Sequence, residues 1–396
     1  MEVDLEEKKA ASNSGGIGGW RSILERKRDE WKTVPLNLAV IGYTDVGKSS
    51  FINAIRGLIA DDQGAAPVGV KETTVDSRSY PHPNNPLLKF WDLPGFGTDR
   101  FPRQTYLTDI DVDRYDFFLL ITATRFTEND TWLGNELRKR NKKYFFIRTG
   151  IGVDISNDKK AHPRTHNEEA VVRKIRESTE KHLRETGCEY APVFLIDSYK
   201  PMKFDFDQLL YRMIQEFPNL KKHALTLSFQ ATYREMIRLK VAELRTRMWI
   251  AATLAGAVGA IPVPAVSASF DIVVVTFEVR FYFTQLGLDE TSLKRYSKFT
   301  SIDHQQLQDT VHKCLGFNVA GVETIRELLK TAGPLMSCAA ASEVVKFFPV
   351  VGSLIAAPLS FGGTQYTLKR VLGKMESAAL EVIQVAEISA ADADDD

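Results

Sequence analysis

The residues best suited to chemistry lie in a glycine-rich loop in the first part of the chain. Residues 42–50 read Gly-Tyr-Thr-Asp-Val-Gly-Lys-Ser-Ser and match the pattern G-x-x-x-x-G-K-[ST]. Gly42 and Gly47 let the backbone turn its N–H groups toward an anion, and a helix that begins after them adds further unpaired N–H groups. Lys48 adds a positive charge and the Ser49 hydroxyl suits Mg²⁺, which prefers oxygen ligands, so the loop predicts a site for nucleotide phosphates and Mg²⁺. The other predicted contact residues of this loop are Asp45, Val46 and Ser50, with capping as the alternative role of Ser50.

A second motif, Asp92-Leu93-Pro94-Gly95, follows a short apolar run 44 positions after Lys48 and matches D-x-x-G. At the end of a strand beside a phosphate loop, Asp92 would reach Mg²⁺ through water and the Gly95 N–H would bond the terminal phosphate. Hydrolysis would then release the loop that follows. The motif is common by itself, but downstream of a phosphate loop it indicates a GTPase switch.

The polar segment 68–75, between these two motifs, suits a loop that orders over the γ-phosphate. A threonine in such a loop supplies a second oxygen to Mg²⁺, and we predict Thr74 in this role, with Thr73 as the neighbouring alternative. Because threonine also favours strands, a purely structural role stays open.

Phe96 stands directly after Gly95, where many signalling GTPases carry a glutamine that orients water. Intrinsic hydrolysis is therefore expected to be slow, with a group from a partner molecule positioning water or neutralising charge. Candidates for supporting groups within the chain are Glu72, Arg100 and Arg103, although each fits equally well as a solvated loop charge.

Short apolar runs and helical patterns alternate through residues 36–218, which is typical of a parallel sheet covered on both faces. The predicted strands are 36–41, 87–91, 117–122, 144–149 and 193–196, and the predicted helices are 128–140, 167–185 and 205–216. The fold class that follows is an α/β P-loop GTPase domain with a doubly wound, mostly parallel sheet. Its first strand and first helix would hold the phosphate loop between them.

Beyond about residue 220, long helical periodicity replaces the alternation, as in 233–249, 292–297, 305–315 and 322–329. A chain of 396 residues is too long for one typical domain. The predicted organisation is a disordered N-terminus over 1–18, an N-terminal helical segment over 19–34, the P-loop domain over 35–220, an all-α domain over 221–385 and an acidic tail over 386–396.

Two segments of the helical part, 248–270 and 347–368, are uncharged and long enough to raise the question of membrane insertion. Each carries two prolines, Pro262 and Pro264 in the first and Pro349 and Pro358 in the second. Since proline breaks a straight helix, we predict two short buried helices meeting at a proline corner in each segment. Membrane contact is the alternative.

The composition and the N-terminal sequence indicate which partners and which cellular compartment to expect. The chain has 51 basic and 51 acidic side chains, so no net field draws it to nucleic acid, and no nucleic-acid partner is expected. Three scattered cysteines, Cys188, Cys314 and Cys338, fit a reducing compartment without a disulfide or zinc framework. The N-terminus lacks a signal peptide, and Glu2 stands where myristoylation would require glycine. We therefore expect a cytoplasmic protein.

Taken together, these residues resemble the immunity-related GTPases, an interferon-inducible, dynamin-like family. The resemblance covers nearly the whole chain and rests on strings such as Phe51-Ile52-Asn53-Ala54, Phe90-Trp91-Asp92-Leu93-Pro94-Gly95 and Thr122-Ala123-Thr124-Arg125-Phe126. It implies a GTPase domain flanked by a helical domain built from both ends of the chain, with residues 20–33 packed against 220–380.

The resemblance also implies a mechanism and partners. A homodimer or oligomer would form through the GTPase faces when GTP is bound, and hydrolysis to GDP would be stimulated across the dimer. The resemblance assigns Glu72 as the catalytic switch glutamate, Thr74 as the switch threonine, and Lys48 as the mark of the GKS subtype. The family acts on intracellular membranes, so a peripheral membrane contact through the helical domain or through partners is expected.

One stretch departs from the family. The guanine-reading segment runs Thr-Lys-x-Asp in the family, whereas residues 149–154 here read Thr-Gly-Ile-Gly-Val-Asp. Losing the carboxylate that accepts two N–H groups of guanine would cost about 2–4 kcal/mol. Thr149 is still expected at the nucleotide; Asp154 either moves in to read the base or only caps the following turn. The next loop near the base contributes Asp197 and Ser198.

Three functions follow in order of preference. The first is a GTPase that binds GTP with Mg²⁺ and hydrolyses it slowly unless dimerised. The second is a non-hydrolysing, nucleotide-dependent scaffold with a degenerate guanine pocket, which Gly150 and Gly152 favour. The third, a P-loop ATPase or kinase, is disfavoured by the D-x-x-G switch.

Overall fold

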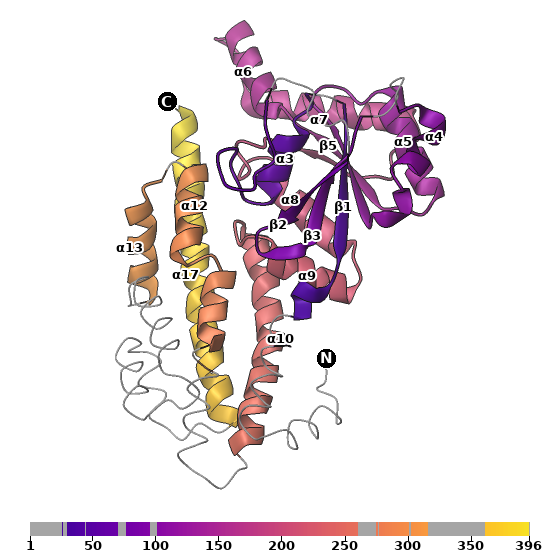
Figure 1. The fold of residues 1–396 in the computed structure, drawn as a ribbon. Coiled ribbons are helices and arrows are strands. Elements are labelled where there is room, and N and C mark those ends of the chain that lie inside the picture. Colours follow the sequence, from indigo (N-terminus) through magenta and orange to yellow (C-terminus); the bar gives the residue numbers. More distant parts are fainter. Residues whose placement is uncertain are drawn as a thin grey trace. The chain divides into compact units, whose positions relative to one another are not determined.

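The computed structural model describes residues 26, 30–43, 45–69, 77–95, 101–259, 275, 277–300, 302–315 and 361–395. The chain divides into two compact units, one formed by Lys32–Phe229 and the other by Gln230–Asp396 together with Met1–Trp31. Figure 1 shows the elements with the labels used below. The predicted disordered N-terminus lies outside the described residues, as does most of the predicted segment 19–34, of which the 3-10 helix η1, Glu30–Thr33, is described.

Six strands form the sheet of the first unit in the order β2-β3-β1-β4-β5-β6. Their bounds are β1 Leu36–Ile41, β2 Arg78–His82, β3 Asn85–Asp92, β4 Phe117–Thr122, β5 Tyr144–Arg148 and β6 Val193–Leu195. In this sheet β2 runs antiparallel to β3, and the other neighbouring strands are parallel. The predicted α/β fold with a mostly parallel sheet is confirmed. β1 lies between β3 and β4, so the order of the strands reverses beside β1. In doubly wound sheets, ligands bind at the carboxyl ends of the strands next to such a reversal.

Helices cover both faces of this sheet (Figure 1). Their bounds are α3 Lys48–Ile55, α4 Arg103–Asp109, η2 Val112–Arg114, α5 Glu128–Lys139, α6 Ile151–Ala161, α7 Glu168–Glu185, α8 Phe206–Gln215 and α9 Asn219–Ser228. On one face, Trp91 and Phe118 of the sheet belong to a buried cluster with Tyr106 of α4 and Leu133 of α5. On the other, the rings of Phe51 in α3 and of Phe206 in α8 lie with centroids 6.1 Å apart.

Five elements of this unit, β2, α4, η2, α6 and α9, are not among the sequence predictions. β2 contains Pro81, which disfavours a strand, but β2 lies at the sheet edge where a missing N–H is tolerated. α6 is hidden by two glycines, yet Gly150 adopts a φ of 73° and begins the helix as its N-cap, with Gly152 in the first turn. A local pattern therefore underestimates helix at the segment where the base site is expected.

The described part of the second unit is helical. Its helices are α10 Arg234–Gly259, a helix over 277–285, α12 Glu290–Thr300, α13 His304–Leu315 and α17 Phe361–Asp395. α17 packs against α10, α12 and α13. Ion pairs from Arg234 to Glu387 and from Arg245 to Glu376 join α10 to α17.

The two uncharged segments of the sequence are partly described. Residues 248–259 continue α10, and residues 361–368 begin α17. The prolines at the expected corners lie outside the described residues, as does the predicted helix 322–329. Among the described helices, none is long and apolar enough to cross a membrane. The acidic residues from 386 onward continue α17 as far as Asp395.

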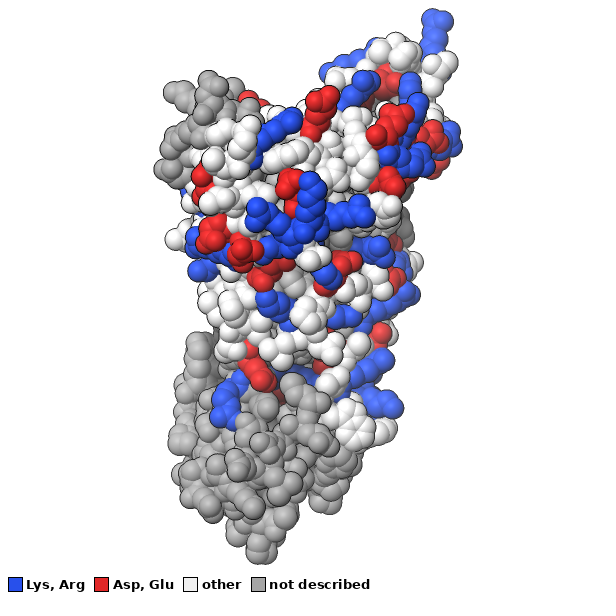
Figure 2. All heavy atoms as spheres, turned by 90° about the vertical axis from the view of Figure 1, so that its right-hand side faces the viewer, with Lys and Arg blue, Asp and Glu red and all other residues white. Residues whose placement is uncertain are grey.

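The surface carries both signs of charge. Figure 2 shows basic and acidic side chains close to one another across the face in view. This distribution agrees with the equal numbers of basic and acidic residues in the sequence. The described surface on this face therefore does not form one extended field of a single sign.

Candidate functional site

The phosphate loop joins the carboxyl end of β1 to the amino end of α3. Gly47 is the N-cap of α3 and has a φ of 87°, a conformation that L side chains rarely adopt. A side chain at Gly42 would overlap the backbone oxygen of Ile121 at the end of β4, so the loop lies directly against the neighbouring strand. The first turn of α3 contains no acidic residue, so its N–H groups and positive dipole end remain suited to an anion.

Lys48 is held across this loop and is only 8% exposed. Its ammonium group donates to the carbonyl oxygens of Gly42 at 3.0 Å and of Tyr43 at 2.9 Å. Val46 is buried beside it, Asp45 is exposed, and Ser49 and Ser50 are half-buried at the start of α3. The structure thus brings the predicted phosphate residues together at the point where the strand order reverses.

The Asp-x-x-Gly loop lies next to the phosphate loop because β3 pairs with β1. Asp92 is the register partner of Val40 and is 2% exposed, and the Leu93 N–H donates to the Val40 carbonyl at 3.0 Å. A Cβ at Gly95 would stand 3.4 Å from the Gly42 oxygen, so the two loops touch. Ser49 in the first turn of α3 carries a hydroxyl and Asp92 at the end of β3 carries a carboxylate, and both are the hard oxygen ligands that Mg²⁺ prefers.

Tyr106 of α4 fixes the start of the second loop, a role that sequence reasoning missed. Its ring is fully buried and its hydroxyl donates to the Pro94 carbonyl at 2.8 Å. Burial raises the pKa of Tyr106 well above its ordinary value, so the hydroxyl keeps its proton and acts as a donor. The sequence signal was weak, because a tyrosine in an unrecognised short helix has no distinguishing spacing.

We expect Tyr106→Phe to lower the free energy of unfolding of the first unit by about 1–2 kcal/mol, because it removes this buried donor. The matched control is Tyr211→Phe on α8, whose side chain is 38% exposed and which should change stability little. Urea unfolding of both variants measures the difference. Equal stability of the two would contradict an anchoring role for the Tyr106 hydroxyl.

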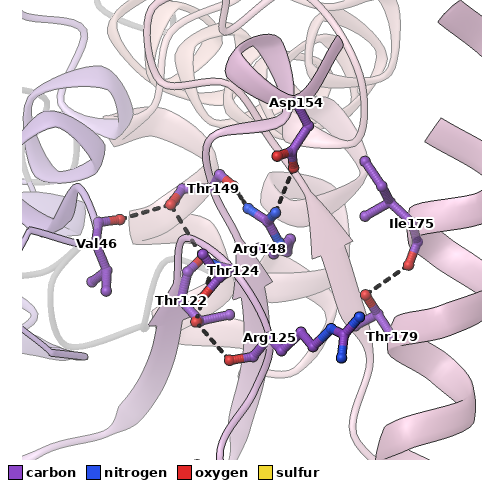
Figure 3. A network of polar contacts seen from close by, with 9 residues as sticks. All are labelled: Val46, Thr122, Thr124, Arg125, Arg148, Thr149, Asp154, Ile175 and Thr179. Atoms are coloured by element: carbon purple, nitrogen blue, oxygen red, sulfur yellow. Dashed lines mark hydrogen bonds and ion pairs between the residues drawn. The ribbon is translucent and has the colours of Figure 1, made fainter. Parts of the chain in front are cut away.

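The loop after β5 also touches the phosphate loop, as Figure 3 shows. The Thr149 hydroxyl lies 2.7 Å from the Val46 carbonyl, to which it donates, and the Thr149 N–H donates to the Thr122 carbonyl at 2.8 Å. Thr149 is buried. Thr149 therefore holds the loop after β5 against the phosphate loop. This structural role accounts for a threonine at position 149 without a direct contact to the nucleotide.

Asp154 is engaged by a neighbouring side chain. Its Oδ2 forms an ion pair with the guanidinium of Arg148, which also donates to the Thr149 carbonyl (Figure 3). The Arg148 side chain is only 7% exposed; burial lowers its pKa, and the Asp154 charge acts in the opposite direction. The Asp154 carboxylate is thus bound to the buried guanidinium of Arg148. Arg148 was missed from the sequence, where a charge at the end of an apolar strand was the available signal.

Asp197 and Ser198 follow β6 and are half-buried. The Asp197 Oδ1 accepts from the Tyr199 N–H at 2.9 Å, and the Tyr199 hydroxyl lies 3.3 Å from the Ser50 hydroxyl. The Ser198 hydroxyl is buried and makes no hydrogen bond to the described residues. This loop therefore borders the start of α3 on the base side.

Several predicted residues lie outside the described part of the chain: Glu72, Thr73, Thr74, Phe96 and Arg100. Arg103 is described at the start of α4, where its guanidinium donates to the Asn129 side chain and lies 5.8 Å from the Trp132 ring centroid. These contacts give Arg103 a packing role.

The sheet order, the phosphate loop and the adjoining Asp-x-x-Gly loop define a P-loop nucleotide-binding protein of the GTPase class. The family model described as "Interferon-inducible GTPase (IIGP)" matches residues 4–351. The chain belongs to the interferon-inducible GTPase family, which confirms the resemblance to the immunity-related GTPases.

Individual relatives are similar over much of their length. The chain is 37% identical over 278 residues to the T-cell-specific guanine nucleotide triphosphate-binding protein 2 of Mus musculus, covering 70% of this chain and 66% of that protein, just under two thirds. It is 36% identical over 315 residues to Interferon-inducible GTPase 1 of Mus musculus, covering 80% and 76%. It is 32% identical over 379 residues to Interferon-inducible GTPase 5 of Rattus norvegicus, covering 96% and 81%.

Proposed function

We propose that this chain binds GTP with Mg²⁺, hydrolyses it to GDP and phosphate, and does so faster when two copies dimerise through their nucleotide faces. The observation that carries the proposal is the position of Lys48. Its buried ammonium lies beside the N-terminus of α3 and next to the Asp92 loop, at the switch point of the sheet. Family membership supports guanosine triphosphate as the ligand.

Each residue of the phosphate half has a distinct role in this proposal. Lys48 and the N–H groups at the start of α3 bind and orient the outer phosphates. Ser49 would hold Mg²⁺ directly, Asp92 would hold it through water, and the resemblance adds Thr74. When bound, the metal neutralises charge on the phosphates during transfer to water.

Dimerisation accounts for the activation of hydrolysis. Phe96 leaves the chain without the glutamine that orients water in many GTPases. We propose that Glu72 activates hydrolysis and that the partner subunit completes the arrangement. This step rests on the resemblance to the family. The same resemblance supports peripheral contact with intracellular membranes, and the scattered cysteines support a reducing compartment such as the cytoplasm.

The test is GTP turnover per molecule, measured with Mg²⁺ over a wide range of protein concentrations. We expect turnover per molecule to rise by about tenfold or more with concentration, because each subunit supplies groups that the other lacks. A Glu72→Ala variant should bind GTP but lose the rise. Turnover per molecule that is independent of concentration would overturn the dimerisation step.

The second candidate function is a non-hydrolysing scaffold that responds to bound nucleotide. The observation in its favour is the pair of glycines at positions 150 and 152, which removes two groups that hold guanine in the family. GTP-dependent self-association without phosphate release at any concentration would favour the scaffold over the GTPase.

A further inference from the structure

The space beside Gly152 is filled by another residue. Gly152 lies in the first turn of α6, at the position where the family carries its guanine-reading aspartate. A Cβ added to Gly152 would overlap Oδ2 of Asp197 and would stand 3.4 Å from its Cγ. A carboxylate from the loop after β6 therefore occupies the place where the side chain of residue 152 would begin.

Local hydrogen bonds hold the Asp197 carboxylate in this place. The Oδ1 atom of Asp197 accepts from the Tyr199 N–H at 2.9 Å, and the backbone carbonyl of Asp197 accepts from the Lys200 N–H at 3.2 Å. These two bonds form a tight turn that fixes the direction of the side chain. Among the described residues, no donor to Oδ2 is found, so this oxygen keeps its accepting capacity.

The loop that carries Asp197 is closed at its base. The Leu195 N–H donates to the Asp205 carboxylate at 2.8 Å, and the Asp205 N–H donates to the Leu195 carbonyl at 3.0 Å. Arg176 of α7 donates to both carboxylate oxygens of Asp205, at 2.7 and 2.6 Å. The segment 196–204 is thus held at both ends by hydrogen bonds, and Asp197 belongs to this closed loop.

The loop also lies at the correct side of the nucleotide site. β6 pairs with β5, and Leu195 is the register partner of Arg148, one residue before Thr149. Thr149 contacts the phosphate loop, and Tyr199 reaches Ser50 at the start of α3. Asp197 therefore lies where the loop after β6 meets the start of α6, and its loop reaches the start of α3 through Tyr199.

The other carboxylate of this region is directed elsewhere. Asp154 forms an ion pair with the guanidinium of Arg148, and turning it toward a base would leave a buried cation without this partner. Asp197 forms no ion pair with a described residue; burial lowers the pKa of Lys203, and the Asp197 charge only partly opposes that effect. Of these two side chains, the geometry favours Asp197 as an acceptor for a ligand.

We propose that Asp197 reads guanine in this chain, in place of the carboxylate missing from position 152. A carboxylate accepts two parallel N–H bonds, and guanine offers the matching donors at N1 and at its C2 amino group. Adenine presents no such pair, so Asp197 would restore selectivity for guanine. This inference rests on the proposed function, because it assumes that GTP occupies the site.

The decisive experiment is a change of base preference. Xanthine has N1–H but a carbonyl at C2, so an amide side chain, with one acceptor and one donor, matches xanthine as a carboxylate matches guanine. We expect Asp197→Asn to weaken GTP binding by about 30-fold or more and to make XTP the preferred ligand. Competition of GTP, XTP and ATP against a fluorescent GTP analogue, with Mg²⁺, measures this. Asp113→Asn, an exposed carboxylate paired with Lys142, is the matched control.

A second variant tests the shared space. Gly152→Asp places two carboxylates in one volume, so we expect it to weaken GTP binding. Adding Asp197→Ser to Gly152→Asp should recover the loss, because one carboxylate then remains. Weakening without recovery in the double variant would contradict the shared position.

The possible failures are distinguishable. If the unaltered protein prefers GTP to ATP and Asp197→Asn leaves that preference unchanged, the inference is wrong and the GTP-binding function stands. A switch to XTP in Asp154→Asn, and not in Asp197→Asn, would assign the base to Asp154. If the unaltered protein binds GTP and ATP equally, no residue reads guanine. If it binds neither, the proposed function fails and the inference fails with it.

Discussion

Replacing Lys48 with alanine should lower the affinity for GTP by about a hundredfold or more and should abolish measurable turnover. The ammonium is buried within the phosphate loop, where charge-assisted bonds to two phosphates contribute about 3 kcal/mol or more together. Alanine also removes the two bonds from the ammonium to the Gly42 and Tyr43 carbonyls, so the loop loses internal support. Isothermal titration with GTP and a phosphate-release assay measure the two effects.

The control for this variant removes a lysine elsewhere in the same unit. Lys181 on α7 is 71% exposed and lies 3.9 Å from Glu185. Lys181→Ala should therefore bind and hydrolyse GTP as the unaltered protein does. Unaltered turnover in Lys48→Ala would remove the phosphate loop from the mechanism.

Replacing Glu278 with glutamine should lower the free energy of unfolding of the helical unit by about 3–5 kcal/mol. Glu278 lies in the helix over 277–285, is almost completely buried, and accepts two bonds of 2.7 Å from the guanidinium of Arg247 in α10. Arg247 also lies 4.1 Å from the ring centroid of Phe281. The neutral amide leaves the guanidinium charge largely buried without its counter-ion. The free energy lost in this way is larger than the net stabilisation that the intact ion pair contributes.

Glu235→Gln provides the matched control in the same unit. Glu235 pairs with Arg238 on the exposed side of α10, with side chains 49% and 64% exposed, so its loss should cost less than about 0.5 kcal/mol. Urea unfolding monitored in the helical unit measures both variants. Equal midpoints for Glu278→Gln and Glu235→Gln would show that the buried pair contributes nothing beyond a surface pair.

The strands of the sheet were largely predictable. The runs 36–41 and 117–122 agree with β1 and β4 residue for residue, because strands buried on both faces must be almost wholly apolar. β2 was not predictable in this way, since it is an edge strand with an exposed polar sequence and a proline. Its pairing with β3 depends on the neighbouring strand and not on its own pattern.

The helices differ for a related reason. α5 and α7 follow amphipathic patterns with side-chain caps at Thr127 and Asn167, so local sequence is sufficient. α6 contains two glycines near its start and is nevertheless helical, because Ile151 and Ile155 pack with Leu195 in a buried cluster. Tertiary packing here outweighs a low local preference.

The sequence by itself determined the phosphate half of the site. The motif that predicts these residues is contiguous, and it lies between a strand and a helix that the sequence also predicts. The proposed base half depends on the tertiary structure, because its groups come from two loops that the sheet brings together. Only the tertiary arrangement places Asp197 in the space beside Gly152 and pairs Asp154 with the buried Arg148. The motif alone shows that position 152 lacks the family's aspartate. Which residue of another segment lies in its place depends on how the loops pack.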